Sequence, residues 1–212
     1  MTKATPIPFI LLSIFAIVAL LPFGSPSMAP GQAKIDAGDT AWMLTASALV
    51  LLMTPGLSFF YGGMVSFKNV VSTMLQSVIA LGIISLLWVG VGFSLAFGDD
   101  LGGWHLVGDP RTFLMFNGVG TETHTLAPTI PLVVFAMFQL KFAIITPALI
   151  TGSFAERVRF SSYLLFMVLF SLFIYCPLAH MTWHPEGLFF KWGVKDFAGG
   201  TVVHMSAGFA AL

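Results

Sequence analysis

The sequence predicts an all-α membrane protein, built as a polytopic bundle of transmembrane helices. Hydrophobic residues make up 57% of its 212 residues and charged residues only 8%, with a mean hydropathy of +0.94. Soluble domains carry roughly 25% charged residues, so the composition alone indicates a bilayer environment. Several apolar runs also reach the ~20 residues that a helix needs to cross the hydrocarbon core. Nine basic and nine acidic residues give zero net charge, which argues against nucleic acid as a partner.

Residues 1–33 have the pattern of a signal peptide. Lys3 supplies a weakly positive start, and residues 7–21 form an apolar stretch that is too short to span a bilayer comfortably. Proline and glycine end this stretch and small-x-small triplets follow, so we place the cleavage site near Ala33. The alternative is an uncleaved additional helix.

From Asp39 onward the chain has four full apolar spans and part of a fifth. The first contains Thr54-Pro55-Gly56, which should kink it. The last is still apolar where the sequence stops at Leu212, and it rises only about 24 Å against a hydrocarbon core of about 30 Å. We therefore expect a truncated portion of a longer protein. The predicted transmembrane helices are residues 41–64, 70–97, 129–154, 161–181 and 196–212.

Loop length and charge predict the orientation. Short basic loops follow the first and third spans, and they contain Lys68, Arg157 and Arg159. The connection between the second and third spans, residues 98–128, is long and includes acidic side chains. By the positive-inside rule the short loops face the cytoplasm. We expect a multi-pass protein of the inner (plasma) membrane, with its N-terminus outside after signal cleavage.

The start of the fifth span combines a carboxylate with an imidazole. In a continuous helix, eight residues rise about 12 Å, which places Asp196 at the interface and His204 near mid-depth. An ionisable group at that depth is rare and costly, so we interpret His204 as lining a path for a small neutral solute. The alternative is a buried histidine that only hydrogen-bonds a neighbouring backbone group or hydroxyl. Asp196 can cap the helix by accepting from the next turn's amides, and it can also favour a cation at an outer mouth.

Three aromatic residues are candidates for the same path. Trp183 ends the fourth span, where it is either an interfacial anchor or a ring face for a small cation, worth ~0.5–2 kcal/mol. Phe138 and Phe142 lie one turn apart on the third span and therefore share a face. Most such pairs are packing contacts, whereas a pore gated by phenyl rings would exclude water and ions.

The other polar residues of the spans have no clear part in this path. Lys141 costs ~2.5–3.5 kcal/mol on insertion scales and is rotated about 100° from Phe142, so we expect it at a subunit interface or snorkelling. His180 and His184 have the i, i+4 spacing of a metal-ligand pair, but without an accompanying ligand cluster we interpret them as an incidental pair at the outer interface. The spans contain no catalytic motif, and we expect no enzyme activity, cofactor or metal.

Several ordered motifs resemble the ammonium transporter (Amt/Mep/Rh) family, on its Amt branch. The resemblance covers roughly residues 39–212 and corresponds to the N-terminal half of the family's fold. The matching stretches are Phe59–Val65, Lys68–Val70, Leu95–Gly98, Ile145–Phe160, Ala179–Trp183 and Asp196–Gly208.

The resemblance implies a fold and a set of roles. Family members are trimers of eleven-helix subunits, each with two inverted five-helix halves, a final helix and one pore. By motif position, Trp183 is similar to the aromatic residue of the outer ammonium site and Phe142 to one of two stacked gate phenylalanines. His204 is similar to the first of twin pore histidines, and Asp196 to the aspartate that supports ammonium recruitment. Phe138 shares the face of Phe142 and is assigned to the pore with it.

The implied activity is transport of ammonium, with methylammonium as an analogue. The family recruits ammonium outside, removes its proton, and conducts ammonia and the proton inward by separate steps. Members often bind a PII-type regulator at the cytoplasmic face. The second gate phenylalanine, the outer-site serine and the second pore histidine belong to the family's second half, which this sequence does not contain.

Two alternatives remain open on the residues alone. The chain could belong to an Amt-like sensor that signals instead of conducting, which a fused signalling domain would reveal. It could also be a metal- or haem-binding membrane anchor that uses His180, His184 and His204, which bound metal or a Soret band would reveal.

Overall fold

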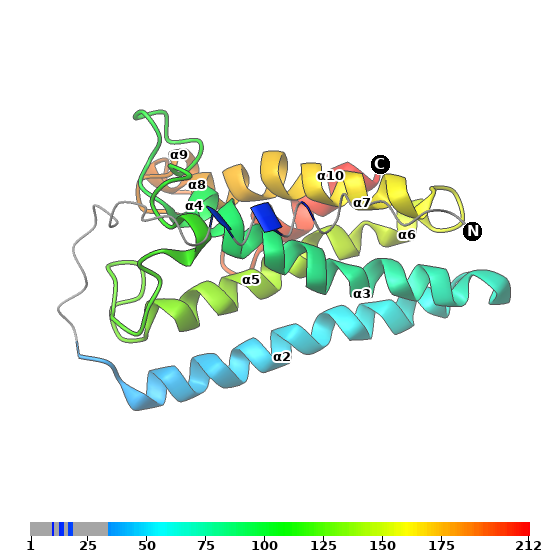
Figure 1. The fold of residues 1–212 in the computed structure, drawn as a ribbon, viewed down its shortest axis with the longest axis horizontal. Helices are drawn as coiled ribbons and strands as arrows, with labels where there is room; N and C mark the ends of the chain where they lie inside the picture. The colour runs from blue at the N-terminus through cyan, green and yellow to red at the C-terminus, as the bar shows by residue number, and fades with distance from the viewer. Residues whose placement is uncertain (1–9, 11–12, 15–16, 19–33) are drawn as a thin grey trace.

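The computed structural model describes residues 10, 13–14, 17–18 and 34–212 (Figure 1). Apart from five isolated positions, the predicted signal peptide lies outside the described residues. The described residues contain isolated β-bridges but no β-strand. The predicted fold class, an all-α polytopic membrane protein, is confirmed. Within the described part, the helical segments long and apolar enough to cross a bilayer are Ala37–Gly62, Phe67–Phe97, Leu132–Phe154 and Phe160–Lys191.

The first span is helix α2 (Ala37–Gly62). It begins where it does because the Asp36 side chain accepts a hydrogen bond from the backbone N–H of Asp39 at 2.8 Å, which caps the first turn. The helix continues through Pro55 without interruption. Large apolar side chains project from it, and Trp42 and Phe59 are 71% and 70% exposed. In a bilayer this face is suited to lipid or to another apolar protein surface.

The second span combines α3 (Val70–Leu87), a π-helical turn (Trp88–Gly92) and α4 (Phe93–Phe97). Trp88 is 1% exposed, and its indole N–H donates to the Ala136 carbonyl at 3.0 Å. That bond satisfies the one polar atom of a large buried ring. Trp88 therefore ties the second span to the third at the centre of the bundle.

The remaining helices complete a single packed bundle. Helices α2, α3 and α5 contact one another pairwise, and α4 packs on α8 (Figure 1). The third and fourth spans and the last segment consist of α5 (Leu132–Leu149), α6 (Thr151–Phe154), α7 (Phe160–Phe170), a π-helical turn (Ser171–Tyr175), α8 (Cys176–Trp183), α9 (Leu188–Lys191), a second π-helical turn (Gly200–Met205) and α10 (Ser206–Ala211).

One end of the bundle carries a cap, formed by residues 98–131 and 184–195 (Figure 1). The Ser94 hydroxyl accepts the backbone N–H of Phe113 at 2.9 Å, and the N–H of Leu188 donates to the His105 carbonyl at 2.9 Å. The cap backbone also approaches α4 closely, because a Cβ at Gly108 would collide with the Ser94 carbonyl oxygen. These contacts hold the cap over the ends of α4 and α8.

At the opposite end of the bundle lie two short loops, one between α2 and α3 and one between α6 and α7 (Figure 1). Glu156 joins these loops. Its Oε1 accepts the backbone N–H of Ser66 at 2.9 Å and the amide of Asn69 at 2.8 Å. These hydrogen bonds, first the one from Asn69 and then those from Ser66, lower the pKa of Glu156 to about 2. The carboxylate therefore favours the folded loop arrangement whenever it is ionised.

We expect Glu156→Gln to remove a pH-dependent part of the stability. The pKa of Glu156 in the folded protein, about 2, lies below its ordinary value of 4.5. The stabilisation is therefore present above about pH 4.5 and is lost as the pH falls from there toward about 2. Thermal unfolding across this range should show a shallower acid loss in Glu156→Gln than in the wild type. Glu122→Gln, which removes an exposed carboxylate of the cap, is the control, and equal slopes in all three proteins would contradict this assignment.

Candidate functional site

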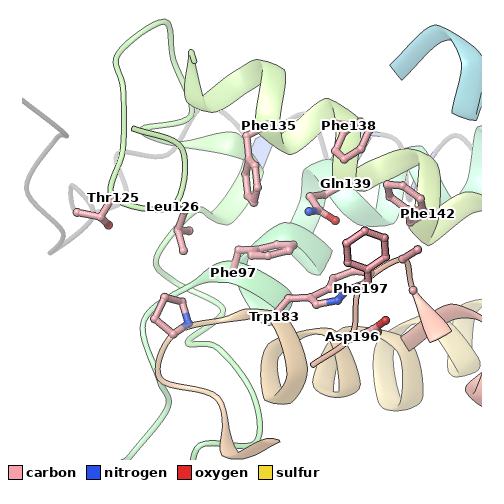
Figure 2. A pocket seen from close by; sticks show the side chains of 13 residues that line it. Phe97, Thr125, Leu126, Phe135, Phe138, Gln139, Phe142, Trp183, Asp196 and Phe197 are labelled. Atoms are coloured by element: carbon pink, nitrogen blue, oxygen red, sulfur yellow. The ribbon is translucent and has the colours of Figure 1, made fainter. Parts of the chain in front are cut away.

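A cavity of about 560 Å³ lies at the cap end of the bundle. Figure 2 shows that its walls come from α4, α5, the end of α8, the cap loop at Thr125 and Leu126, and the chain that leads into the last helix. A concave, mostly apolar space between segments that are distant in sequence is typical of ligand pockets. The lining residues are Phe97, Thr125, Leu126, Phe135, Phe138, Gln139, Phe142, Trp183, Pro185, Asp196, Phe197, Ala198 and Gly199.

Aromatic rings form one continuous wall of the cavity (Figure 2). Phe138 and Phe142 meet edge to face with ring centroids 5.0 Å apart. Phe142 is in turn 6.3 Å from Trp183, and Trp183 stacks on Phe97 at 6.5 Å. Three of the residues predicted for the path, Phe138, Phe142 and Trp183, therefore line one space. Ring faces attract a small cation by ~0.5–2 kcal/mol each, depending on desolvation.

Asp196 adds a carboxylate to the same cavity. Its Oδ2 accepts the backbone N–H groups of Thr201 at 3.3 Å and Val202 at 3.1 Å, so it caps the following helix as the sequence suggested. The helix starts at Gly200, four residues later than predicted, because Gly199 has a φ of 78°. That left-handed conformation suits glycine and interrupts the helix. The second oxygen, Oδ1, is buried and has no hydrogen-bond partner among the described residues.

Gln139 is a lining residue that the sequence analysis missed. It lies among the rings of the cavity, and its Oε1 is buried without a hydrogen-bond partner in the described part of the chain (Figure 2). A buried amide oxygen without a partner is costly, which makes it available to a donor in the cavity. A polar residue directly beside Phe138, in a run that is apolar apart from Lys141, was the signal that could have identified it.

His204 does not line this cavity. It lies in the π-helical turn Gly200–Met205, and its side chain is exposed, as are those of Met205 and Phe209 nearby. The predicted pore histidine and the predicted aromatic site are thus not brought together within the described residues. Lys141 is half-buried and is also absent from the lining.

His180 and His184 differ from their predicted environment. They stack with ring centroids 4.6 Å apart and are 0% and 1% exposed, so they are not an interfacial pair. Their burial could not be predicted from the sequence, because nothing in the pattern of the fourth span indicates that the cap folds over α8. Among the described residues, no group of three or more histidine, cysteine, aspartate or glutamate side chains is placed to hold a metal ion.

In a bilayer-spanning helix bundle, a pocket where ring faces meet a carboxylate can attract a small cation. The chain belongs to the Ammonium Transporter Family, whose family model matches residues 41–212. The resemblance stated from the sequence motifs is therefore confirmed.

Curated relatives and solved structures agree with this assignment. An ammonium transporter of Mycobacterium tuberculosis (strain ATCC 25618 / H37Rv) is 46% identical over 199 residues, covering 84% of this chain and 41% of that protein. An ammonium transporter of Aquifex aeolicus is 44% identical over 205 residues, covering 96% and 45%. The crystal structure of Saccharomyces cerevisiae Mep2 superposes with a TM-score of 0.77 at 30% identity, covering 89% of this chain and 43% of that one. The chain thus spans less than half the length of these relatives.

Proposed function

We propose that this chain forms the ammonium-recruiting part of a transmembrane ammonium channel or transporter. The observation that carries the proposal is the convergence of Phe142, Trp183 and Asp196 on one cavity at the end of a membrane bundle. A monovalent cation with N–H donors fits such a space, because ring faces and a carboxylate attract the charge while Gln139 offers an acceptor. The curated relatives, which are ammonium transporters, support ammonium as that cation.

The proposed path runs from the cap end, taken as the outer face, toward His204. Ammonium is recruited between Phe142 and Trp183 and loses its proton. Ammonia then passes the Phe138–Phe142 pair, and the proton is conducted inward by a separate step. A passage closed by phenyl rings strongly disfavours a hydrated ion, since the ion would lose its water without replacement. Asp196 caps the turn that bears His204, so the recruiting carboxylate and the imidazole share one structural unit.

The whole assembly is also proposed from family likeness. Because the chain spans less than half of its relatives' length, we propose that further protein covers the exposed face at His204 and supplies the opposite pore wall. We propose a homotrimer in the inner (plasma) membrane, with the N-terminus outside after signal cleavage. A PII-type regulator is the proposed partner at the face that carries Lys68, Arg157 and Arg159. Transport, not catalysis, is the proposed activity.

We expect Phe142→Ala to lower methylammonium uptake about tenfold, because a lost cation–π contact of about 1.4 kcal/mol corresponds to that factor. The test is uptake by the full-length protein in cells that lack their own ammonium transporters. His204→Ala should also reduce uptake. Phe173→Ala is the matched control, since this ring is 70% exposed on the outside of the bundle. Wild-type uptake in both Phe142→Ala and His204→Ala, at equal expression, would contradict the assigned roles.

A sensor is the second candidate function. A solved structure named as a sensor Amt protein superposes with a TM-score of 0.71 at 30% identity, covering 81% of this chain and 42% of that one. A signalling domain joined to this chain in the full-length protein, together with an absence of methylammonium uptake, would favour the sensor over the transporter. The metal or haem anchor has no comparable support in the described residues.

A further inference from the structure

Four of the five histidines of the sequence lie in or beside the cap, and none of these lines the aromatic cavity. His124, His180 and His184 are 4%, 0% and 1% exposed. Oδ1 of Asp100 is 3.4 Å from Nε2 of His180, and its Oδ2 is 3.4 Å from Nδ1 of His105. We refer to Asp100, His105, His124, His180 and His184 as the histidine–aspartate cluster.

Backbone contacts define the proton positions on two of these rings. Nδ1 of His184 accepts the backbone N–H of Glu186 at 3.2 Å, and Nδ1 of His124 accepts that of Leu126 at 3.3 Å. In a neutral imidazole the other nitrogen then carries the hydrogen. Both Nε2 atoms are buried without a hydrogen-bond partner among the described residues. With their lone pairs used at Nδ1, these two rings are poorly disposed to bind a metal.

His180 has the opposite arrangement and faces a carboxylate. Its Nδ1 lies 3.3 Å from the Ala96 carbonyl oxygen, which can only accept, so this nitrogen carries the hydrogen. In the neutral ring, Nε2 then carries a lone pair, and this lone pair faces Oδ1 of Asp100. Two acceptors therefore face each other in a buried site with no hydrogen between them. One added proton converts this contact into a charge-assisted hydrogen bond.

We propose that the histidine–aspartate cluster is a proton-binding site, loaded from the side of the membrane that the cap faces. An external acid transfers its proton to Nε2 of His180, so that its own O–H or N–H bond breaks while an N–H bond directed at Asp100 forms. The product is a buried imidazolium paired with a carboxylate. No redox change or further reactant is required.

Charged and titratable groups surround the His180–Asp100 pair, and they come from every segment that packs against it. Asp100 and His105 belong to the cap segment after α4, and the backbone N–H of Asp100 donates to the Glu186 carboxylate at 3.3 Å. The ammonium of Lys191 approaches the His105 ring at 3.1 Å. Among the described groups, the carboxylates of Asp99, Asp100 and Glu186 outnumber the one lysine, so an added proton reduces the net negative charge around the pair. The facing titratable and charged groups are Asp99, Asp100, His105, His124, His184, Glu186 and Lys191.

Proton binding here acts on the wall of the aromatic cavity. His184 follows Trp183 directly in the chain and precedes Pro185, and both of those residues line the cavity. A positive charge on the stacked His180–His184 pair disfavours a second cation close by. Resting on the proposed function, we expect acid on the cap side to reduce methylammonium uptake several-fold. Methylammonium itself stays protonated throughout, since alkylammonium groups such as that of lysine titrate near pH 10.4.

The test uses the full-length protein in lipid nanodiscs and measures thermal unfolding from about pH 8 to about pH 4. This range extends well below the ordinary histidine pKa of about 6.5, because removal of the partner charge moves the inflection toward acid. Asp100→Asn removes the partner charge and should move the inflection of the profile toward acid by about 1 unit or more. His180→Asn keeps a donor toward Ala96 but removes Nε2. In the His180→Asn background, Asp100→Asn should shift the inflection much less, because only the contact between Asp100 and His105 then remains.

The cap also offers a control variant, and it contains a second buried histidine whose titration contributes to every unfolding profile. Glu122→Gln removes an exposed carboxylate and should leave the profile unchanged. Burial lowers the pKa of the His124 imidazole, so that ring contributes stability above about pH 6.5 that is lost as the pH falls. This contribution is common to all the variants and cancels in the comparison.

The outcomes separate the proton site from the proposed transport. An acid shift in the unfolding profile of Asp100→Asn, together with an equal shift in the pH dependence of uptake into proteoliposomes, is the expected result. Unfolding profiles that superimpose for the wild type, Asp100→Asn and His180→Asn would overturn the proton site. Complete absence of uptake at every pH would overturn the proposed function instead, while the unfolding comparison would still decide the proton site.

Discussion

Asp196→Ala should reduce methylammonium uptake by about 100-fold in the full-length protein. The carboxylate accepts two backbone N–H groups that start the turn bearing His204, and it supplies the negative charge of the cavity. Hydrogen bonds to a charged group contribute ~1.5–3 kcal/mol each, and each 1.4 kcal/mol is about a factor of ten. The alanine variant loses both hydrogen bonds, which loosens the helix start. It also loses the negative charge that attracts a cation.

Asp196→Asn separates these two contributions. Its amide oxygen still accepts from the backbone N–H groups of Thr201 and Val202, while the charge is gone, so the helix start should persist. The purified Asp196→Asn protein should therefore retain the thermal stability of the wild type. Uptake by Asp196→Asn should nevertheless remain well below that of the wild type. If Asp196→Ala transported methylammonium within about twofold of the wild type, neither the capping nor the recruiting role would matter for transport.

Trp88→Ala should give the largest loss of stability among single substitutions of the bundle core. The ring is 1% exposed and contacts Phe93, Phe97 and Tyr175, with centroid distances of 5.8, 6.3 and 6.5 Å. Removal of a buried tryptophan costs about 3–5 kcal/mol in protein cores, and here it also leaves the Ala136 carbonyl without its donor. The unfolding temperature in detergent should fall by several degrees.

Trp88→Ala should also affect transport, although Trp88 itself does not line the cavity. Phe97 stacks on Trp183 in the cavity, so the void left at Trp88 allows this wall to shift. Uptake should therefore fall together with stability. Trp104→Ala is the matched control, because Trp104 is 69% exposed in the cap. Equal unfolding temperatures for the two variants would contradict the central place given to Trp88.

The helices could be predicted from the sequence because a membrane span has a direct signature in length and hydropathy. Their ends could not, since local backbone geometry decides them. The helix after Asp196 begins only at Gly200, because Gly199 adopts a left-handed conformation that an apolar run does not reveal. Asp196 could still be recognised as a cap, since an acidic residue just before a helix has that role whichever residue begins the turn.

The candidate site was predictable to the extent that its residues share a helix or a family motif. Phe138 and Phe142 share a face by spacing, and motif likeness associated Trp183 with them. Phe97 and Gln139 were missed because their place in the cavity depends on how α4 and α5 pack, which the pattern of either helix alone does not specify. Burial of His180 was missed for a related reason, since the long loop that covers it has no periodic pattern.

The most direct test of the account is a structure of the full-length protein, in a lipid environment, with bound methylammonium. We predict the cation in the cavity against the rings of Phe142 and Trp183, with its ammonium group directed toward Gln139 or Asp196. We also predict that His204 faces a narrow path beneath it, covered by protein that lies outside this chain. A cation bound elsewhere, or His204 in contact with lipid, would contradict the account.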